Sequence, residues 1–241
     1  MNRPILFSHP NKAQMIAHRG LSGLETENSA AAFVAAGQHP YFGIETDVHR
    51  TKDGQFIIIH DNSTGRVCNE NLPVEETVFS VLSSLRLKDI HTGAWRQDLM
   101  LPTLSDYLSI LRHYGKHAVL ELKRAFEPED IQKIISIVDQ AAYLPFTTFI
   151  SFKLNNLISL RSFLPHQSAQ YLVEYSADGV LDILKEHRLG LDIDYTLLTG
   201  ELVEKVHALG QKVNVWTVDE PKDAIALCDM GVDQITSNIL L

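Results

Sequence analysis

Short β-rich runs alternate with amphipathic helical segments along nearly the whole chain. The pattern predicts strands at 15–18, 41–50, 117–123, 147–152, 170–174, 189–195, 212–218 and 232–237, and helices at 28–37, 104–114, 128–140, 154–163, 178–187, 199–209 and 221–230. This alternation is typical of a parallel sheet, because each helix returns the chain to the start of the next strand.

A closed barrel of eight parallel strands is the α/β architecture that best fits this pattern. The TIM (β/α)8 barrel uses eight strand–helix units in about 250 residues, and this chain has 241 residues. The main alternative is an open doubly wound sheet, which usually has a glycine-rich phosphate loop after its first strand. The sequence contains neither Gly-x-Gly-x-x-Gly nor a P-loop motif. We therefore predict a single TIM (β/α)8 barrel domain over residues 1–241.

Two irregularities modify the barrel pattern. Residues 51–103 interrupt it between the second strand and the helix that follows, so we expect them to form a small inserted subdomain. The sequence ends at Leu241, shortly after the eighth strand, and shows no eighth helix. The N-terminal segment or a neighbouring subunit would then cover the eighth gap, or the gap would stay partly open. Cover by a neighbouring subunit would make the protein a homo-oligomer.

Charge and cysteine content exclude several classes of protein. The chain has 21 Lys and Arg against 30 Asp and Glu, a formal net charge of −9. General binders of nucleic acid or of anionic membranes normally have the opposite sign. The 2 cysteines are too few for a disulfide framework. The first residues do not have the pattern of a signal peptide, so we expect none, and no stretch approaches the 18 or so apolar residues of a membrane span. We expect a cytoplasmic protein without integral membrane association.

Charged side chains gather at the predicted carboxyl ends of three strands, where TIM barrels place their active sites. The first strand ends in His18 and Arg19. In the second, the alternation of side chains puts Glu45 and Asp47 on one face, with apolar residues on the other. The third strand repeats this arrangement with Glu121 and Lys123. Because the apolar faces suit the helix-covered outside, the charged side chains should point into the barrel.

A predicted hairpin brings a second histidine to the same place. Asp53-Gly54 between two β-rich runs favours a two-residue type I′ turn. In that register Lys52 faces Gln55 and Asp47 faces His60. A longer turn would shift the pairing, but His60 would still return to the neighbourhood of the carboxylates.

These residues together indicate metal-assisted cleavage of a phosphate ester. Three crowded carboxylates, Glu45, Asp47 and Glu121, repel one another unless they are protonated or bridged by a cation. Oxygen ligands suit Mg²⁺, Ca²⁺ or Mn²⁺ rather than zinc. Nearby Arg and Lys side chains can hold phosphate oxygens, and two histidines supply an acid and a base near neutral pH.

Nine short motifs in a fixed order make the sequence similar to a known family. They are His18-Arg19-Gly20, Thr26-Glu27-Asn28-Ser29, Ile44-Glu45-Thr46-Asp47-Val48, Thr51-Lys52-Asp53-Gly54, His60-Asp61, Pro102-Thr103-Leu104, Glu121-Leu122-Lys123, Trp216-Thr217-Val218 and Gly231-Val232-Asp233. In this order and spacing they resemble the glycerophosphodiester phosphodiesterase family, from about residue 15 to residue 238.

The resemblance implies a catalytic TIM barrel with a small subdomain over its mouth and a specific set of site residues. One divalent cation, Mg²⁺ or Ca²⁺ with Mn²⁺ also compatible, would bind Glu45, Asp47 and Glu121. His18 and His60 would be the acid/base pair, Arg19 and Lys123 would hold the phosphate, and Trp216 would line the glycerol pocket. The family hydrolyses glycerophosphodiesters, a small-molecule substrate class, to sn-glycerol 3-phosphate and an alcohol.

The chain departs from the family pattern in three places. Thr26 replaces the usual proline before Glu27, while Asn28 is kept and is expected to cap the helix that follows. Asp219 replaces the asparagine that usually follows Trp-Thr-Val. After the last strand, Thr236-Ser237-Asn238-Ile239 replaces Thr-Asp or Thr-Asn followed by proline and a final helix. None of these changes removes a predicted metal ligand or histidine.

Two other functions remain open at this point. A related barrel phosphodiesterase acting on lysophospholipids would need an exposed apolar loop, for which the insertion offers Leu72, Val78, Phe79 and Trp95. A non-catalytic module that binds glycerophosphodiesters would not require an acid/base pair. The sequence leaves open the alcohol headgroup, the metal, the roles of the two histidines, and attack by water or through a cyclic phosphate. Four further residues could reach the site, namely His49, Glu174, Asp192 and Asp194.

Overall fold

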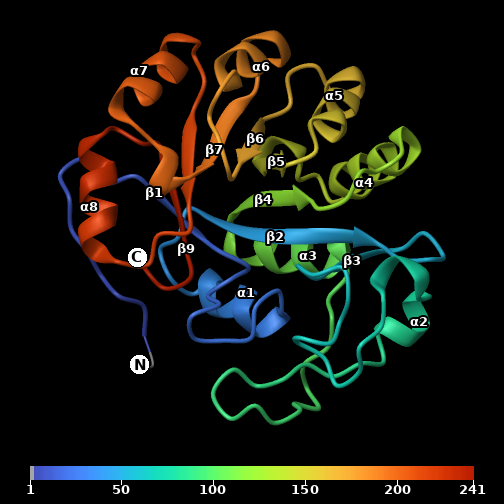
Figure 1. The fold of residues 1–241 in the computed structure, drawn as a ribbon. Helices are drawn as coiled ribbons and strands as arrows, with labels where there is room; N and C mark the ends of the chain where they lie inside the picture. Colours follow the sequence, from blue (N-terminus) through green and yellow to red (C-terminus); the bar gives the residue numbers. More distant parts are fainter. Residues whose placement is uncertain (1–2) are drawn as a thin grey trace.

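Eight parallel strands close into a barrel in the computed structural model, which describes residues 3–241 (Figure 1). The barrel strands are β1 (Gln14–Ala17), β2 (Gly43–Arg50), β4 (His117–Leu122), β5 (Thr147–Ser151), β6 (Ala169–Val173), β7 (Gly190–Asp194), β8 (Val213–Trp216) and β9 (Gln234–Ser237). Neighbouring strands pair in parallel, and β1 pairs with both β2 and β9, which closes the sheet. The predicted TIM barrel is confirmed.

Over residues 3–241, seven helices form the outer layer between the barrel strands. They are α1 (Ala30–Gly37), α3 (Leu104–Tyr114), α4 (Pro128–Gln140), α5 (Leu154–Phe163), α6 (Val180–His187), α7 (Gly200–Ala208) and α8 (Pro221–Asp229). Local sequence explains their ends: Thr103 and Asp106 form a capping box on α3, which stops at Gly115 with a φ of 64°. Proline stands in the first turn of α4 and of α8, where it costs no hydrogen bond. Short helical turns occur at α2 (Phe79–Leu82), η1 (Val74–Glu76), η2 (Leu144–Phe146) and η3 (Tyr195–Leu197).

Alternation along the strands separates the main core from the interior of the barrel. Outward-facing residues such as Ile44 and Leu120 pack with the helices in the largest buried cluster. Inside the barrel, a small apolar cluster of Ile16, Val119, Ile150 and Leu172 fills the middle layer. The inward side chains beyond this cluster, at the carboxyl ends of the strands, are mostly polar. The apolar layer therefore forms a floor below the space at the carboxyl ends of the strands.

The predicted register of the β2 hairpin is wrong by one residue. β3 (Phe56–Ile58) pairs with β2 so that Val48 faces Ile58, and the Thr51 amide donates to the Gln55 carbonyl at 2.8 Å. The loop therefore has three residues, 52–54, with Gly54 in the left-handed region that such loops place last. The Asp53 carboxylate stabilises it by accepting from the Thr51 hydroxyl at 2.6 Å and the Phe79 amide at 2.9 Å.

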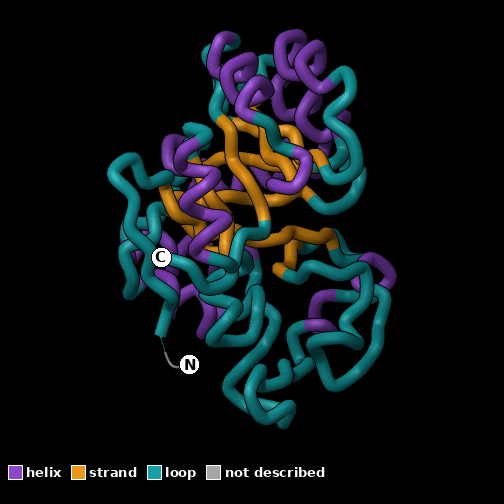
Figure 2. The backbone as a smooth tube through the Cα atoms, turned by 60° about the vertical axis from the view of Figure 1, so that its left-hand side comes forward, coloured by secondary structure: helices purple, strands orange, loops and turns teal. Residues whose placement is uncertain are grey.

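The segment between β3 and α3 has its own small core beside the barrel mouth. Its buried apolar residues include Ile57, Ile59, Cys68, Leu82 and Leu101. Figure 2 shows this segment as mostly loop, with α2 and η1 as short helical turns. The β2–β3 hairpin joins it directly to the barrel, and its side chains also contact the loop between β1 and α1, for example Arg96 with Glu25 at 3.3 Å.

The N-terminal segment pairs with the residues after β9, where an eighth helix would otherwise lie. The Ile5 amide donates to the Ile239 carbonyl at 3.0 Å, and the Leu241 amide donates to the Ile5 carbonyl at 2.8 Å. Phe7 and Leu240 are buried in the main cluster. Of the arrangements expected for the eighth gap, the structure has cover by the N-terminal segment. Among the described residues, no helix is long and apolar enough to cross a membrane.

Candidate active site

A cavity of about 400 Å³ opens at the carboxyl ends of the barrel strands. Its lining contains seven of the eight predicted site residues, namely His18, Arg19, Glu45, His60, Glu121, Lys123 and Trp216. The eighth, Asp47, is buried beside them. Trp216 packs edge-on against Phe152 with ring centroids 5.7 Å apart, and the two rings form an aromatic wall. The structure therefore brings the eight predicted site residues together.

Two neighbouring strands position the three carboxylates. Asp47 on β2 is paired directly with Glu121 on β4, and Glu45 lies two residues earlier on the same face of β2. One oxygen from each carboxylate lies within 4.8 Å of the others. All three side chains are buried, with Asp47 only 1% exposed. Register and alternation alone therefore produce a compact group of oxygen donors.

The three carboxyl groups differ in charge state because their neighbours differ. Burial raises the pKa of Asp47, but Lys123 and Arg19 outweigh that effect and hold the pKa well below its usual range. Lys123 Nζ lies 3.4 Å from Asp47 Oδ1, and Arg19 Nε lies 3.5 Å from Asp47 Oδ2. Burial and the Asp47 charge raise the pKa of Glu45 well above its usual value and that of Glu121 to about 8. Asp47 is thus the anionic centre of the group.

The carboxylate group fits a divalent cation. Asp47 Oδ1 and Glu121 Oε1 are buried and accept no hydrogen bond of good geometry, although Lys123 Nζ lies within ion-pair distance of both. Glu45 and Glu121 would otherwise have to hold protons near neutral pH. A divalent cation would replace those protons, and an all-oxygen donor set suits Mg²⁺, Ca²⁺ or Mn²⁺.

Arg19 adopts an unusual backbone conformation that links β1 to this group. Its φ is 54°, and its amide donates to Glu45 Oε2 at 2.8 Å, while its guanidinium donates to Glu27 Oε1 at 3.0 Å. Gly20 follows at φ 79°, where a Cβ atom would lie 2.7 Å from Ala32. The His-Arg-Gly motif therefore makes a tight turn that only glycine can continue, and this turn directs the arginine toward the cavity.

Both histidines use Nδ1 for a structural hydrogen bond. His18 Nδ1 lies 2.8 Å from Asn238 Oδ1, and His60 Nδ1 lies 2.7 Å from Asp61 Oδ1. These oxygens only accept, so each Nδ1 carries the hydrogen and each Nε2 is left to exchange a proton. Burial lowers the pKa of His18 to about 4 and also lowers that of His60. Both rings are thus oriented for proton transfer at Nε2.

Asn28 does not cap a helix as expected. Ser29 caps α1, and its side chain accepts from the Ala32 amide. The Asn28 side chain instead donates to Asp47 Oδ2 at 2.7 Å and accepts from the Thr46 hydroxyl at 2.7 Å. Asn28 has a φ of 53°, which asparagine tolerates better than most residues. Its role is to orient the anionic centre of the site.

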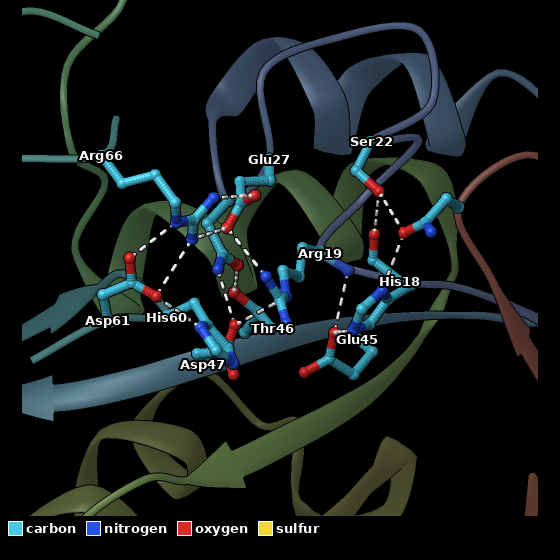
Figure 3. A network of polar contacts seen from close by, with 12 residues as sticks. His18, Arg19, Ser22, Glu27, Glu45, Thr46, Asp47, His60, Asp61 and Arg66 are labelled. Carbon is cyan, nitrogen blue, oxygen red and sulfur yellow. Dashed lines mark hydrogen bonds and ion pairs between the residues drawn. The ribbon is translucent and has the colours of Figure 1, made fainter. Parts of the chain in front are cut away.

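A network of charged residues outside the predicted set supports the site from the insertion side (Figure 3). Arg66 donates to both oxygens of Glu27, at 2.7 and 2.6 Å, and to Asp61 Oδ2 at 2.6 Å. Glu27 in turn holds Arg19, and Asp61 holds His60. Glu27 and Asp61 stand in motifs that the sequence had already shown, whereas no sequence pattern marked Arg66.

The remaining candidates divide into those near the cavity and those with structural roles. Glu174 and Asp192 line it, whereas Asp194 accepts from the Thr196 amide as the cap of η3. His49 is buried, with Nε2 3.2 Å from the His60 carbonyl, so it supports the backbone beneath the second histidine. Among residues 3–241, the cavity lining includes none of the apolar insertion residues Leu72, Val78, Phe79 and Trp95.

The buried carboxyl group of Asp192, beside this cavity, is expected to make the free energy of unfolding depend on pH. It is 1% exposed, its Oδ1 has no hydrogen-bond partner, and burial raises its pKa to about 7. The folded carboxyl keeps its proton when the unfolded one has lost it, so stability falls as pH rises from about 4 to about 7. At about pH 8, Asp192→Asn is therefore expected to raise the free energy of unfolding by on the order of 1–4 kcal/mol.

Urea unfolding of wild type and variant at a series of pH values measures this difference. The exposed Asp139→Asn on α4 is the matched control and should leave the profile unchanged. A difference between Asp192→Asn and wild type that does not grow with pH would contradict the prediction.

Comparison with known proteins finds relatives that match nearly the whole chain. Residues 18–239 match the model of the glycerophosphoryl diester phosphodiesterase family. A glycerophosphodiester phosphodiesterase of Bacillus subtilis is 26% identical over 95% of this chain and 84% of its own length. One from Caldanaerobacter subterraneus is 28% identical over 94% of each chain.

Solved structures extend this similarity to three dimensions. An Oleispira antarctica phosphodiesterase in complex with the product sn-glycerol-3-phosphate superimposes with a TM-score of 0.84 and 28% identity, covering 94% of this chain and 93% of that one. A glycerophosphodiester phosphodiesterase from Parabacteroides distasonis gives a TM-score of 0.80 and 29% identity, covering 95% and 94%. The similarity extends over the insertion as well as the barrel.

Proposed function

The chain belongs to the glycerophosphoryl diester phosphodiesterase family, and from that premise we propose that it hydrolyses glycerophosphodiesters to sn-glycerol 3-phosphate and an alcohol, using one divalent cation and a pair of histidines. The observation that supports this most strongly is the convergence on one cavity of three buried carboxylates, two histidines with free Nε2 atoms and two cationic side chains. The enzyme class is that of its relatives, glycerophosphodiester phosphodiesterases.

Glu45, Asp47 and Glu121 would hold the cation. When bound there, a divalent cation supplies Lewis-acid stabilisation of the negative charge that grows on the phosphoryl oxygens. The proposal of Mg²⁺, Ca²⁺ or Mn²⁺ rests on the all-oxygen donor set and on the two buried carboxylate oxygens without hydrogen bonds.

Arg19 and Lys123, which lie beside different oxygens of Asp47, would bind the phosphate. Each already has a fixed position, because Glu27 orients the Arg19 guanidinium and Glu121 lies 3.0 Å from Lys123 Nζ. Cations that are held in place lose little freedom when substrate binds, and they stabilise charge that develops in the transition state. Trp216 and Phe152 offer an apolar wall against which the carbon chain of glycerol would pack.

His18 and His60 would transfer the protons. One ring is neutral and accepts the proton of the nucleophile at Nε2. The other ring enters the reaction as the imidazolium, with a hydrogen on both nitrogens, and donates its Nε2 hydrogen to the departing alkoxide as the bond to phosphorus breaks. The nucleophile is water or the 2-hydroxyl of glycerol, which forms a cyclic phosphate first. A cyclic phosphate trapped during a single turnover would identify the second route.

The decisive experiment measures glycerol 3-phosphate released from glycerophosphocholine and glycerophosphoethanolamine. Purified protein is assayed with EDTA, and then with Mg²⁺, Ca²⁺ or Mn²⁺ restored. Release that EDTA abolishes and a metal restores is the expected result. Lysophosphatidylcholine is assayed in parallel, and we expect little release from it, because within residues 3–241 the cavity lining includes no apolar residue of the insertion. Folded protein that binds glycerophosphocholine without cleaving it under any metal would favour a binding module and contradict the proposal.

A further inference from the structure

Asp219, one of the three departures from the family pattern, is the last member of a hydrogen-bond chain that reaches His18. Its Oδ1 accepts from the Ser237 hydroxyl and from the Asn238 amide, both at 2.8 Å. Its Oδ2 accepts from Asn238 Nδ2 at 2.6 Å. Asn238 Oδ1 then faces His18 Nδ1 at 2.8 Å. Asp219 does not belong to the cavity lining, but a single side chain, that of Asn238, connects its carboxylate to His18, a proposed proton-transfer group.

The carboxylate of Asp219 determines which end of the Asn238 amide faces the histidine. A carboxylate can only accept, so the NH₂ end of Asn238 must face Asp219 and the carbonyl end must face His18. Ser22 Oγ lies 2.8 Å from Asn238 Oδ1 and 2.7 Å from the His18 carbonyl, and its single hydrogen can go to either oxygen, so Asp219 and not Ser22 fixes the amide. The amide orientation thereby places the ring hydrogen of His18 on Nδ1 and leaves Nε2 unprotonated, 4.0 Å from Glu45 Oε2.

The two histidines differ in the group that fixes their tautomer. His60 is paired directly with the carboxylate of Asp61, which can only accept and therefore fixes the tautomer by itself. His18 is paired with an amide, which presents an acceptor or a donor depending on its rotation. An amide can fix the tautomer of a histidine only if a further group fixes the amide, and here that group is Asp219.

We propose that Asp219 is a positioning residue that sets the tautomer of His18 through Asn238. The proposal rests on the proposed role of His18 in proton transfer for its effect on activity, but not for its effect on the tautomer. With a neutral amide at position 219, the Asn238 side chain can rotate and present its NH₂ to His18 Nδ1. The ring hydrogen then moves to Nε2, and Nε2 can no longer accept a proton from the nucleophile or from solvent.

The test compares Asp219→Asn with a double variant that exchanges the two residues, Asp219→Asn with Asn238→Asp. In the single variant, ¹⁵N NMR of the ring nitrogens is expected to show the His18 hydrogen moved to Nε2. We expect kcat to fall on the order of 10²-fold or more, with KM little changed, because a wrong tautomer removes proton transfer and not binding. In the double variant, the carboxylate at 238 faces His18 and accepts from the amide at 219. The Nδ1 hydrogen and most of kcat should return.

Controls separate this proposal from the proposed function. His18→Ala identifies the His18 ring signals, and the exposed Asp182→Asn on α6 should match wild type. If Asp219→Asn does not fold, Asn238→Ala supplies the same readout, with a mixed tautomer expected. A His18 ring that keeps its hydrogen on Nδ1 in these variants, or a double variant that behaves like Asp219→Asn, overturns the proposal. The NMR result decides this even if wild type has no activity on diesters, an outcome that would refute only the proposed function.

Discussion

Replacing His60 with alanine is expected to lower kcat by on the order of 10²–10⁴-fold while leaving metal binding intact. The ring is held by Asp61, and Arg66 keeps Asp61 in place whether or not the ring is present. The backbone carbonyl of residue 60, which faces His49 Nε2 at 3.2 Å, is also unchanged by the substitution. The loss should therefore be confined to proton transfer. Steady-state kinetics with glycerophosphocholine and a metal titration of the variant measure both expectations.

Three comparisons make this result interpretable. His113→Ala removes an exposed ring on α3, outside the described cavity lining, and should retain wild-type kcat. Imidazole added to His60→Ala should restore part of the activity, because the missing ring leaves space for a diffusible base. His18→Ala should show a loss of similar size. If His60→Ala kept kcat within about threefold of wild type, a general acid/base role would be excluded.

The barrel and the carboxylate group could be predicted because both follow from local periodicity. Alternation along a strand fixes which side chains share a face, so Glu45 and Asp47 had to point the same way once Ile44 and Val48 were assigned to the outside. The position of Glu121 opposite Asp47 follows from two parallel strands that start at the same level in the barrel. Alternation within each strand needs no knowledge of distant contacts, whereas the direct pairing of Glu121 with Asp47 is a property of the folded sheet.

The hairpin register and the role of Asn28 could not be predicted, because distant residues decide them. Both a two-residue and a three-residue loop suit Asp53-Gly54, and the longer one is stabilised by the Phe79 amide, 26 residues away. Asn and Ser are equally good caps, so local preference does not choose between Asn28 and Ser29. Asn28 is drawn away by Thr46 and Asp47.

Arg66 shows a third limit of sequence reasoning. It lies in the irregular insertion, where no helical or strand periodicity indicates which way a side chain points. Its partners, Glu27 and Asp61, belong to two different motifs, and only the folded chain places one guanidinium between them (Figure 3). Asp219 was visible as a departure from the family pattern, but its contact with Asn238 depends on β8 and β9 lying side by side.

Replacing Asp47 with asparagine is expected to weaken both metal binding and catalysis. The change keeps the shape but removes the charge that attracts Lys123 and Arg19 and that would bind the cation. We expect metal affinity to fall on the order of 10²-fold or more, and kcat/KM on the order of 10³-fold, because electrostatic stabilisation of the phosphoryl oxygens depends on the cation. Calorimetric titration with Mn²⁺ and the metal-activation curve measure the two effects. Asp139→Asn is the matched control.

The pH dependence of metal binding distinguishes this explanation from simple damage to the fold. In wild type, burial and the Asp47 charge raise the pKa of Glu121 to about 8, so metal must displace a proton, and affinity should rise with pH up to about 8. Without the Asp47 charge the pKa of Glu121 falls, because one of the two main causes that raise it is gone. The rise in metal affinity should therefore move to lower pH. A variant that binds metal weakly but with an unshifted pH profile would show that Asp47 does not set the charge state of its neighbour. Unchanged activation by metal would remove Asp47 from the ligand set altogether.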